Sequence, residues 1–169
     1  MQKTVSFEKF PFWIIFLSNL HSILIYLTGL FVLYKFHRIA AAIYLIYILF
    51  LEIRIIRTHC INCYYYGKLC GFGKGRISAA LFKKGNPSDF CKTEMTWKDM
   101  IPDMLVTVIP FIAGIVMLII HFDILVLISL ITLLLLASMG NAFIRGSLTC
   151  KYCKQKELGC PADKLFNKE

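Results

Sequence analysis

Four long apolar segments limit what this chain can fold into. The first, residues 12–34, carries no formal charge over about 23 residues, enough for a helix to cross a hydrocarbon core of about 30 Å at about 1.5 Å per residue. Similar segments follow at 39–56, at 101–120 and from 124 to about 144. Hydrophobic residues make up 58% of the chain, more than a soluble domain needs for its core. We therefore predict an all-α integral membrane protein with four transmembrane helices.

The connections between these segments indicate how the helices pair. Residues 35–38 join the first two segments and residues 121–123 join the last two, so each pair must form an antiparallel hairpin. This gives four regions in order. They are a first transmembrane hairpin (1–56), a hydrophilic cysteine-rich loop (57–100), a second transmembrane hairpin (101–145) and a cysteine-rich tail (146–169).

Each hairpin is followed by cysteines at the same spacing, C-x2-C-x6-C. The first cysteine triad is Cys60, Cys63 and Cys70, and the second cysteine triad, 90 positions later, is Cys150, Cys153 and Cys160. We interpret this as an internal duplication in which each half is a hairpin followed by a cysteine knuckle. Placing the two knuckles side by side would tie the halves together in one cap.

The distribution of positive charge predicts the orientation. Of the 19 lysines and arginines, all but Lys35 and Arg38 lie in the N-terminal segment, the central loop and the tail, if Arg54 and Arg145 are counted with the hydrophilic segments they adjoin. The positive-inside rule then places both termini and both triads in the cytoplasm, facing anionic lipid, so the net charge of +9 does not require nucleic acid. The first segment is too long for the apolar region of a signal peptide. In the reducing cytoplasm the cysteines should be thiols or metal thiolates rather than disulfides.

The triads predict a metal site. A C-x2-C pair brings two sulfurs to one turn, and a third cysteine nearby can supply another tetrahedral ligand. Two four-ligand sites need eight ligands, which the seven cysteines and one histidine next to the first triad supply. One assignment has a first site of Cys60, Cys63, Cys70 and Cys91 and a second site of Cys150, Cys153, Cys160 and His59. The alternative is a single shared site of Cys60, Cys63, Cys150 and Cys153.

Tetrahedral sulfur ligation suits both zinc and iron–sulfur clusters. We favour structural Zn²⁺, with a [4Fe–4S] cluster as the alternative. Cys160 is followed by proline, as in the Cys-Pro ending of ferredoxin cluster motifs, but the rest of that motif is absent. A disulfide redox role for the C-x2-C pairs would need a strand–helix context, which the sequence does not indicate.

We place two ionisable residues, His21 and Glu52, clearly within the hydrocarbon core, since Asp103 sits at the edge of its span. On the helical rise their depths differ by only about 5 Å, so the two side chains can meet. An intramembrane charge is by default a candidate proton or ion site. We favour a structural role, in which Glu52 reaches the interface or pairs with Arg54 or Arg57 and His21 hydrogen-bonds inside the bundle.

The central loop also contains the sequence Gly-Phe-Gly-Lys-Gly at residues 71–75. Its spacing matches neither standard phosphate-binding fingerprint, so we expect a flexible turn. After it, Ile77, Ala80 and Leu81 share one face at helical spacing between basic flanks. This pattern predicts a short helix on the membrane surface.

The sequence shows no catalytic constellation, so we expect a protein that is not an enzyme. We predict a docking or accessory subunit of a membrane complex, with a metal-stapled basic face that contacts anionic lipid or a protein partner. One alternative is an iron–sulfur subunit that passes electrons at the membrane surface. A second is a soft-metal ion transporter, which the lack of cysteines within the spans disfavours.

Overall fold

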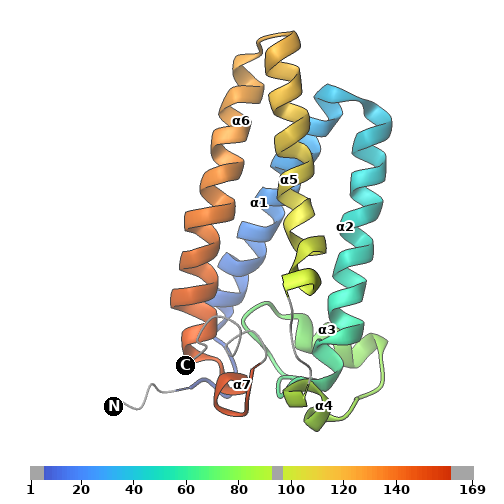
Figure 1. Cartoon of the computed structure of the whole chain (residues 1–169). Helices are drawn as coiled ribbons and strands as arrows, with labels where there is room; N and C mark the ends of the chain where they lie inside the picture. The colour runs from blue at the N-terminus through green and yellow to red at the C-terminus, as the bar shows by residue number, and fades with distance from the viewer. Residues whose placement is uncertain (1–5, 93–96, 161–169) are drawn as a thin grey trace.

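The computed structural model describes residues 6–92 and 97–160, without the side chains of Ser88, Cys91, Lys92 and Trp97. Within that part of the chain the structure is helical, and its only β contact is an isolated bridge between Phe7 and Cys153. Four helices run alongside one another (Figure 1): α1 (Phe12–Phe36), α2 (Arg38–Thr58), α5 (Trp97–Ile120) and α6 (Ile124–Leu135). Counting the turns that extend α2 and α6, each is long and apolar enough to cross a membrane. The predicted all-α fold, with four helices long and apolar enough to cross a membrane, is confirmed.

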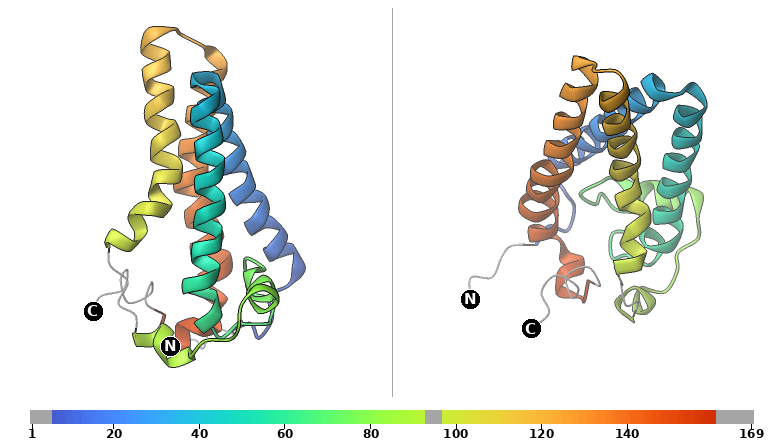
Figure 2. Two further views of the ribbon diagram at one scale, coloured as in Figure 1. Left: turned by 90° about the vertical axis from the view of Figure 1, so that its right-hand side faces the viewer. Right: turned by 45° about the horizontal axis from the view of Figure 1, so that its top comes forward.

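The short elements lie at one end of this bundle and the two tight hairpin connections lie at the other (Figure 2). Three short helices are at the first end: α3 (Lys74–Leu81), α4 (Pro87–Lys92) and α7 (Lys154–Glu157). We call residues 6–10, 59–92 and 150–160 the cap. At the opposite end Lys35 pairs with Asp123 at 3.3 Å, which joins the two hairpin connections.

The helices extend further than the apolar segments predict. α2 continues to Thr58 and α5 begins at Trp97. The fourth helix does not end near residue 144, because the π-helical turns η2 (Leu136–Gly140) and η3 (Ala142–Thr149) prolong it. Hydropathy marks where a helix leaves the hydrocarbon, whereas its backbone hydrogen bonds can continue into the polar region.

α1 is packed against all three other long helices. A core of buried side chains lies between α1, α2 and α5; its members are Leu33, Ala41, Tyr44, Ile48, Leu51 and Val106. Large apolar side chains on the outer faces of the helices are exposed, as expected when the surrounding solvent is lipid.

Pro110 lies inside α5 and cannot donate a hydrogen bond to the carbonyl of Val106. The hydroxyl of Tyr44, from α2, donates a 2.8 Å hydrogen bond to that carbonyl instead. Gly29 of α1 leaves room for this arrangement, because a Cβ there would lie 2.5 Å from the Tyr44 hydroxyl and 3.1 Å from Cγ of Pro110. A neighbouring helix therefore satisfies the carbonyl that proline frees.

Candidate metal centre

Both cysteine triads begin with the same local structure. η1 (Cys60–Asn62) follows α2, and the N–H of Cys63 donates to the carbonyl of Cys60 at 3.3 Å. η4 (Cys150–Tyr152) follows η3, and the N–H of Cys153 donates to the carbonyl of Cys150 at 3.2 Å. In each case a long helix passes directly into a tight 3₁₀ turn, so the first two sulfurs of each triad come from one turn.

The residue after each turn is also extended in a similar way. Cys63 has φ −79° and ψ 151°, and Cys153 has φ −79° and ψ 120°. The residues before the turns, His59 and Thr149, both have helical dihedral angles. The shared C-x2-C spacing thus corresponds to a shared backbone conformation in the two halves.

Hydrogen bonds join the chain around one triad to the chain around the other. The N–H of Tyr64 donates to Oε1 of Gln155 at 2.8 Å, and the N–H of Lys154 donates to the hydroxyl of Tyr65 at 3.0 Å. The Tyr65 hydroxyl in turn donates to the carbonyl of Phe7, whose own N–H donates to the carbonyl of Tyr152 at 2.9 Å. Three segments that are distant in sequence therefore form one unit.

This unit has its own apolar core. Phe10, Ile14, Ile15 and Tyr65 are buried in it. Cys63, Cys70 and Cys153 are half-buried and pack against this core. The cysteines of both halves therefore share one apolar environment beneath the bundle.

Burial in this environment keeps two of the thiols protonated. It raises the pKa of Cys63 to about 11, with negative charge at Cys70, Cys60 and Cys160 acting in the same direction. It also raises the pKa of Cys153 to about 12, with charge at Cys63 and Cys150 adding to the effect. Cys63 thus lies within electrostatic reach of cysteines from both triads.

The six described cysteines are free thiols. Among the residues whose side chains are described, no three His, Cys, Asp or Glu side chains lie close enough to hold a metal ion. Neither assignment of ligands is therefore assembled there. The ring of His59 makes an edge-to-face contact with Phe90, with centroids 6.4 Å apart. The side chain of Cys91 lies outside the described part of the structure.

The glycine-rich stretch at residues 71–75 does more than turn the chain. A Cβ on Gly75 would lie 2.1 Å from the carbonyl oxygen of Tyr65, so only glycine allows α3 to pack this closely on the first triad. Gly73 has φ 71°, a conformation that favours glycine. The side-chain amide of Asn19 on α1 donates to the carbonyl of Phe72 at 3.2 Å. The stretch therefore packs on both the bundle and the first triad.

Glu52 has partners that the sequence does not indicate. Its Oε2 pairs with Nζ of Lys74 at 2.6 Å, and its Oε1 accepts a 2.6 Å hydrogen bond from the hydroxyl of Tyr26. The proposed pairing with Arg54 or Arg57 is wrong. Lys74 comes from the start of α3, so this ion pair connects the cap to the bundle.

His21 does not meet Glu52 either. Its ring lies against the π-helical turn η2, because a Cβ on Gly140 would be 2.6 Å from Cε1 of His21. Nε2 of His21 is buried, and within the described part of the chain it has no hydrogen-bond partner. The hydrogen bond predicted for His21 inside the bundle is therefore not made by Nε2.

The predicted surface helix corresponds in part to α3 (Lys74–Leu81). Gly75 and Ser78 on one side are buried, whereas Ile77, Ala80 and Leu81 are exposed. The apolar face is thus available for the membrane surface, and its contact with lipid stays a prediction.

Comparison with models of protein families, with curated proteins and with solved structures finds no match for this chain.

Proposed function

We propose that this chain is a small multi-pass membrane protein whose cap binds a metal through cysteines of both halves and serves as a docking surface. The observation that supports this most strongly is the packing of the two triads into one unit, through the Tyr64–Gln155 and Tyr65–Lys154 hydrogen bonds. Two knuckles of identical spacing that meet in space are what a metal staple between two halves requires.

The donor set suits a thiophilic metal. Cys153 of the second triad is within electrostatic reach of Cys63 of the first, and both belong to the single shared site. Together with the Tyr64–Gln155 and Tyr65–Lys154 hydrogen bonds, this proximity supports the single shared site over two separate ones. Binding of the metal would draw the thiols closer together and add to the stability of the cap. We propose Zn²⁺ as the metal, with a structural role.

The surface of the cap supports docking. Exposed basic side chains surround it: Arg76, Lys83, Lys84, Lys151 and Lys156. With the cap on the cytoplasmic side, as the charge distribution predicts, these residues would face anionic lipid headgroups and the acidic surface of a partner subunit. A rigid, metal-bound cap would present this surface in one conformation.

Metal analysis with a visible absorption spectrum tests the proposal. The protein should be purified without oxygen, alongside a Cys60→Ser/Cys150→Ser variant and a Cys91→Ser variant. We expect about one equivalent of zinc per chain and no colour, with the metal lost in the double variant and kept in Cys91→Ser, which lies outside the shared site.

Two other outcomes would argue against this proposal. A brown preparation with iron and sulfide would replace the structural role by the electron-transfer alternative. Protein with neither metal nor colour would contradict the metal proposal. The triads would then be interpreted as sites of thiol–disulfide chemistry.

A further inference from the structure

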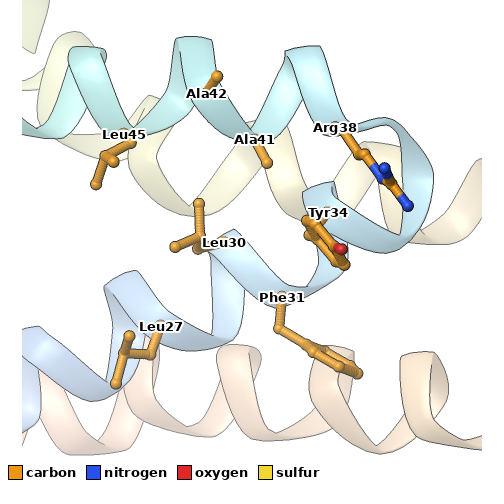
Figure 3. A pocket seen from close by; sticks show the side chains of 8 residues that line it. All are labelled: Leu27, Leu30, Phe31, Tyr34, Arg38, Ala41, Ala42 and Leu45. Carbon is orange, nitrogen blue, oxygen red and sulfur yellow. The ribbon is translucent and has the colours of Figure 1, made fainter.

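We propose that a groove between α1 and α2, at the end of the bundle away from the cap, binds one acidic phospholipid. The groove has a volume of about 410 Å³. It is lined by Leu27, Leu30, Phe31 and Tyr34 of α1 and by Arg38, Ala41, Ala42 and Leu45 of α2. Figure 3 shows Arg38 and Tyr34 together at one end of it and Leu27 and Leu45 at the other.

The shape of the groove follows from the sequence of α2. Ala41 and Ala42 lack the bulk of the neighbouring apolar residues, so the surface is hollow beside them. From Arg38 to Leu45 the helix rises by about 10 Å, which is the length of apolar wall below the charged end. Within a bilayer, such an open apolar groove takes up an acyl chain.

The charge at the mouth of the groove selects the headgroup. Arg38 is the first residue of α2, whose first turn contains no acidic residue, so the guanidinium adds to the positive end of the helix dipole. Within the part of the chain that the structure describes, no carboxylate forms an ion pair with Arg38. Asp123 lies at this end of the bundle but binds Lys35 and the N–H of Leu125.

The two hairpins differ in whether a carboxylate lies at the N-terminus of their second helix. Asp123 caps the N-terminus of α6 and pairs with Lys35. The N-terminus of α2 is instead capped by Nδ1 of His37, and among the described residues no carboxylate pairs with Arg38. The Arg38 guanidinium lies 6.0 Å from the centroid of the Tyr34 ring, so a guanidinium and a phenol are presented together. A phosphate group matches the planar donors of arginine, and tyrosine is typical of headgroup level.

A lipid fits this groove better than a second copy of the chain. The groove is charged at one end and apolar along the rest, which is the distribution of polarity within a single phospholipid. A second copy would need an acidic group opposite Arg38, and the described acidic residue of this end, Asp123, is already paired.

Native mass spectrometry of the full chain in mild detergent tests the site. The protein would be titrated with phosphatidylglycerol and, separately, with phosphatidylcholine of the same acyl chains. We compare the wild type with Arg38→Gln, with Ala42→Phe, which fills the groove, and with Lys35→Gln, which removes a cation from the same end outside the groove. Circular dichroism checks that each variant is folded.

The wild type should bind its first phosphatidylglycerol more tightly than its first phosphatidylcholine. Arg38→Gln should weaken the former roughly tenfold and leave the latter unchanged. Ala42→Phe should weaken both, and Lys35→Gln should keep the wild-type preference. The site would be refuted if Arg38→Gln kept the preference, if Lys35→Gln lost it equally, or if folded Ala42→Phe protein bound both lipids normally. If Ala42→Phe instead turned a dimer into a monomer and left lipid binding unchanged, the groove would be assigned to a second copy of the chain. If Ala42→Phe does not fold, Arg38→Gln against Lys35→Gln decides.

Discussion

The amide oxygen of Gln155 accepts a 2.8 Å hydrogen bond from the backbone N–H of Tyr64, 91 residues away. Gln155 is buried, although glutamine is usually exposed in proteins. This contact holds the chain after one cysteine turn against the chain after the other. Together with the hydrogen bond from the N–H of Lys154 to the Tyr65 hydroxyl, it links the two halves of the cap directly.

Replacing Gln155 by leucine should loosen the cap. The substitution leaves the half-buried N–H of Tyr64 without its acceptor, at a cost of about 1–3 kcal/mol. We expect the backbone amide of Tyr64 to exchange with solvent roughly tenfold faster or more, measured by hydrogen–deuterium exchange. Gln155→Glu keeps an acceptor and should restore most of the protection. Unchanged exchange in Gln155→Leu would show that the contact does not join the halves.

Tyr44→Phe should destabilise the transmembrane bundle. It removes the hydroxyl that donates to the Val106 carbonyl freed by Pro110. Hydrogen bonds of this kind within membranes contribute about 1–2 kcal/mol at most, and we expect a loss of that size in unfolding by sodium dodecyl sulfate. A Tyr44→Phe/Pro110→Ala double variant should lose less than the two single losses combined, because α5 can then satisfy its own carbonyl. Strict additivity would contradict this account.

Lys74→Met should weaken the attachment of α3 to the bundle. It leaves Glu52 without its ion-pair partner in a low-dielectric region, although the Tyr26 hydrogen bond remains. The two side chains are 20% and 26% exposed, so we reduce the cost of a fully buried pair to about 1–2 kcal/mol. The Glu52→Gln/Lys74→Met double variant should recover part of this loss in the same unfolding assay. Arg57→Gln on α2 is a matched control and should have little effect.

The exposed thiol of Cys150 should react with maleimide before those of Cys63 and Cys153 once any bound metal has been chelated. The thiolate is the reacting form, and pKa values of about 11 for Cys63 and about 12 for Cys153 leave very little of it at pH 7. Their labelling rates should therefore rise about tenfold per pH unit between pH 7 and 9. A membrane-impermeant maleimide should reach Cys150 only from the cytoplasmic side. Labelling from the opposite side would reverse the predicted orientation.

The four long apolar helices could be predicted because a bilayer imposes their length and composition. A segment that crosses hydrocarbon must be apolar over about 20 residues, and connections as short as residues 121–123 allow only an antiparallel return. The helix ends could not be predicted in the same way, because hydropathy falls after Leu135 while the backbone stays helical through the π-helical turns as far as Thr149.

The partners of the polar residues could not be read from the sequence either. Helical rise gives the depths of His21 and Glu52 but not the directions in which they point, and the two side chains contact different helices. Lys74 belongs to a loop whose path depends on close packing at Gly75. The only sequence feature that could have indicated this partner of Glu52 was the lysine within the glycine-rich stretch, and it is weakly specific. Gln155 carries no signal at all, because one glutamine in a polar tail is unremarkable until its burial is known.

X-ray absorption spectroscopy at the metal edge would show whether cysteines of both halves hold one metal, because it counts the ligands of the bound metal. We expect a shell of sulfur atoms at about 2.3 Å around zinc, with four sulfurs in the shared site. We also expect Cys63→Ser and Cys153→Ser, one from each half, each to remove a sulfur or release the metal. A shell of only nitrogen and oxygen, or a spectrum that changes with the cysteines of one half alone, would contradict a metal held between the two halves.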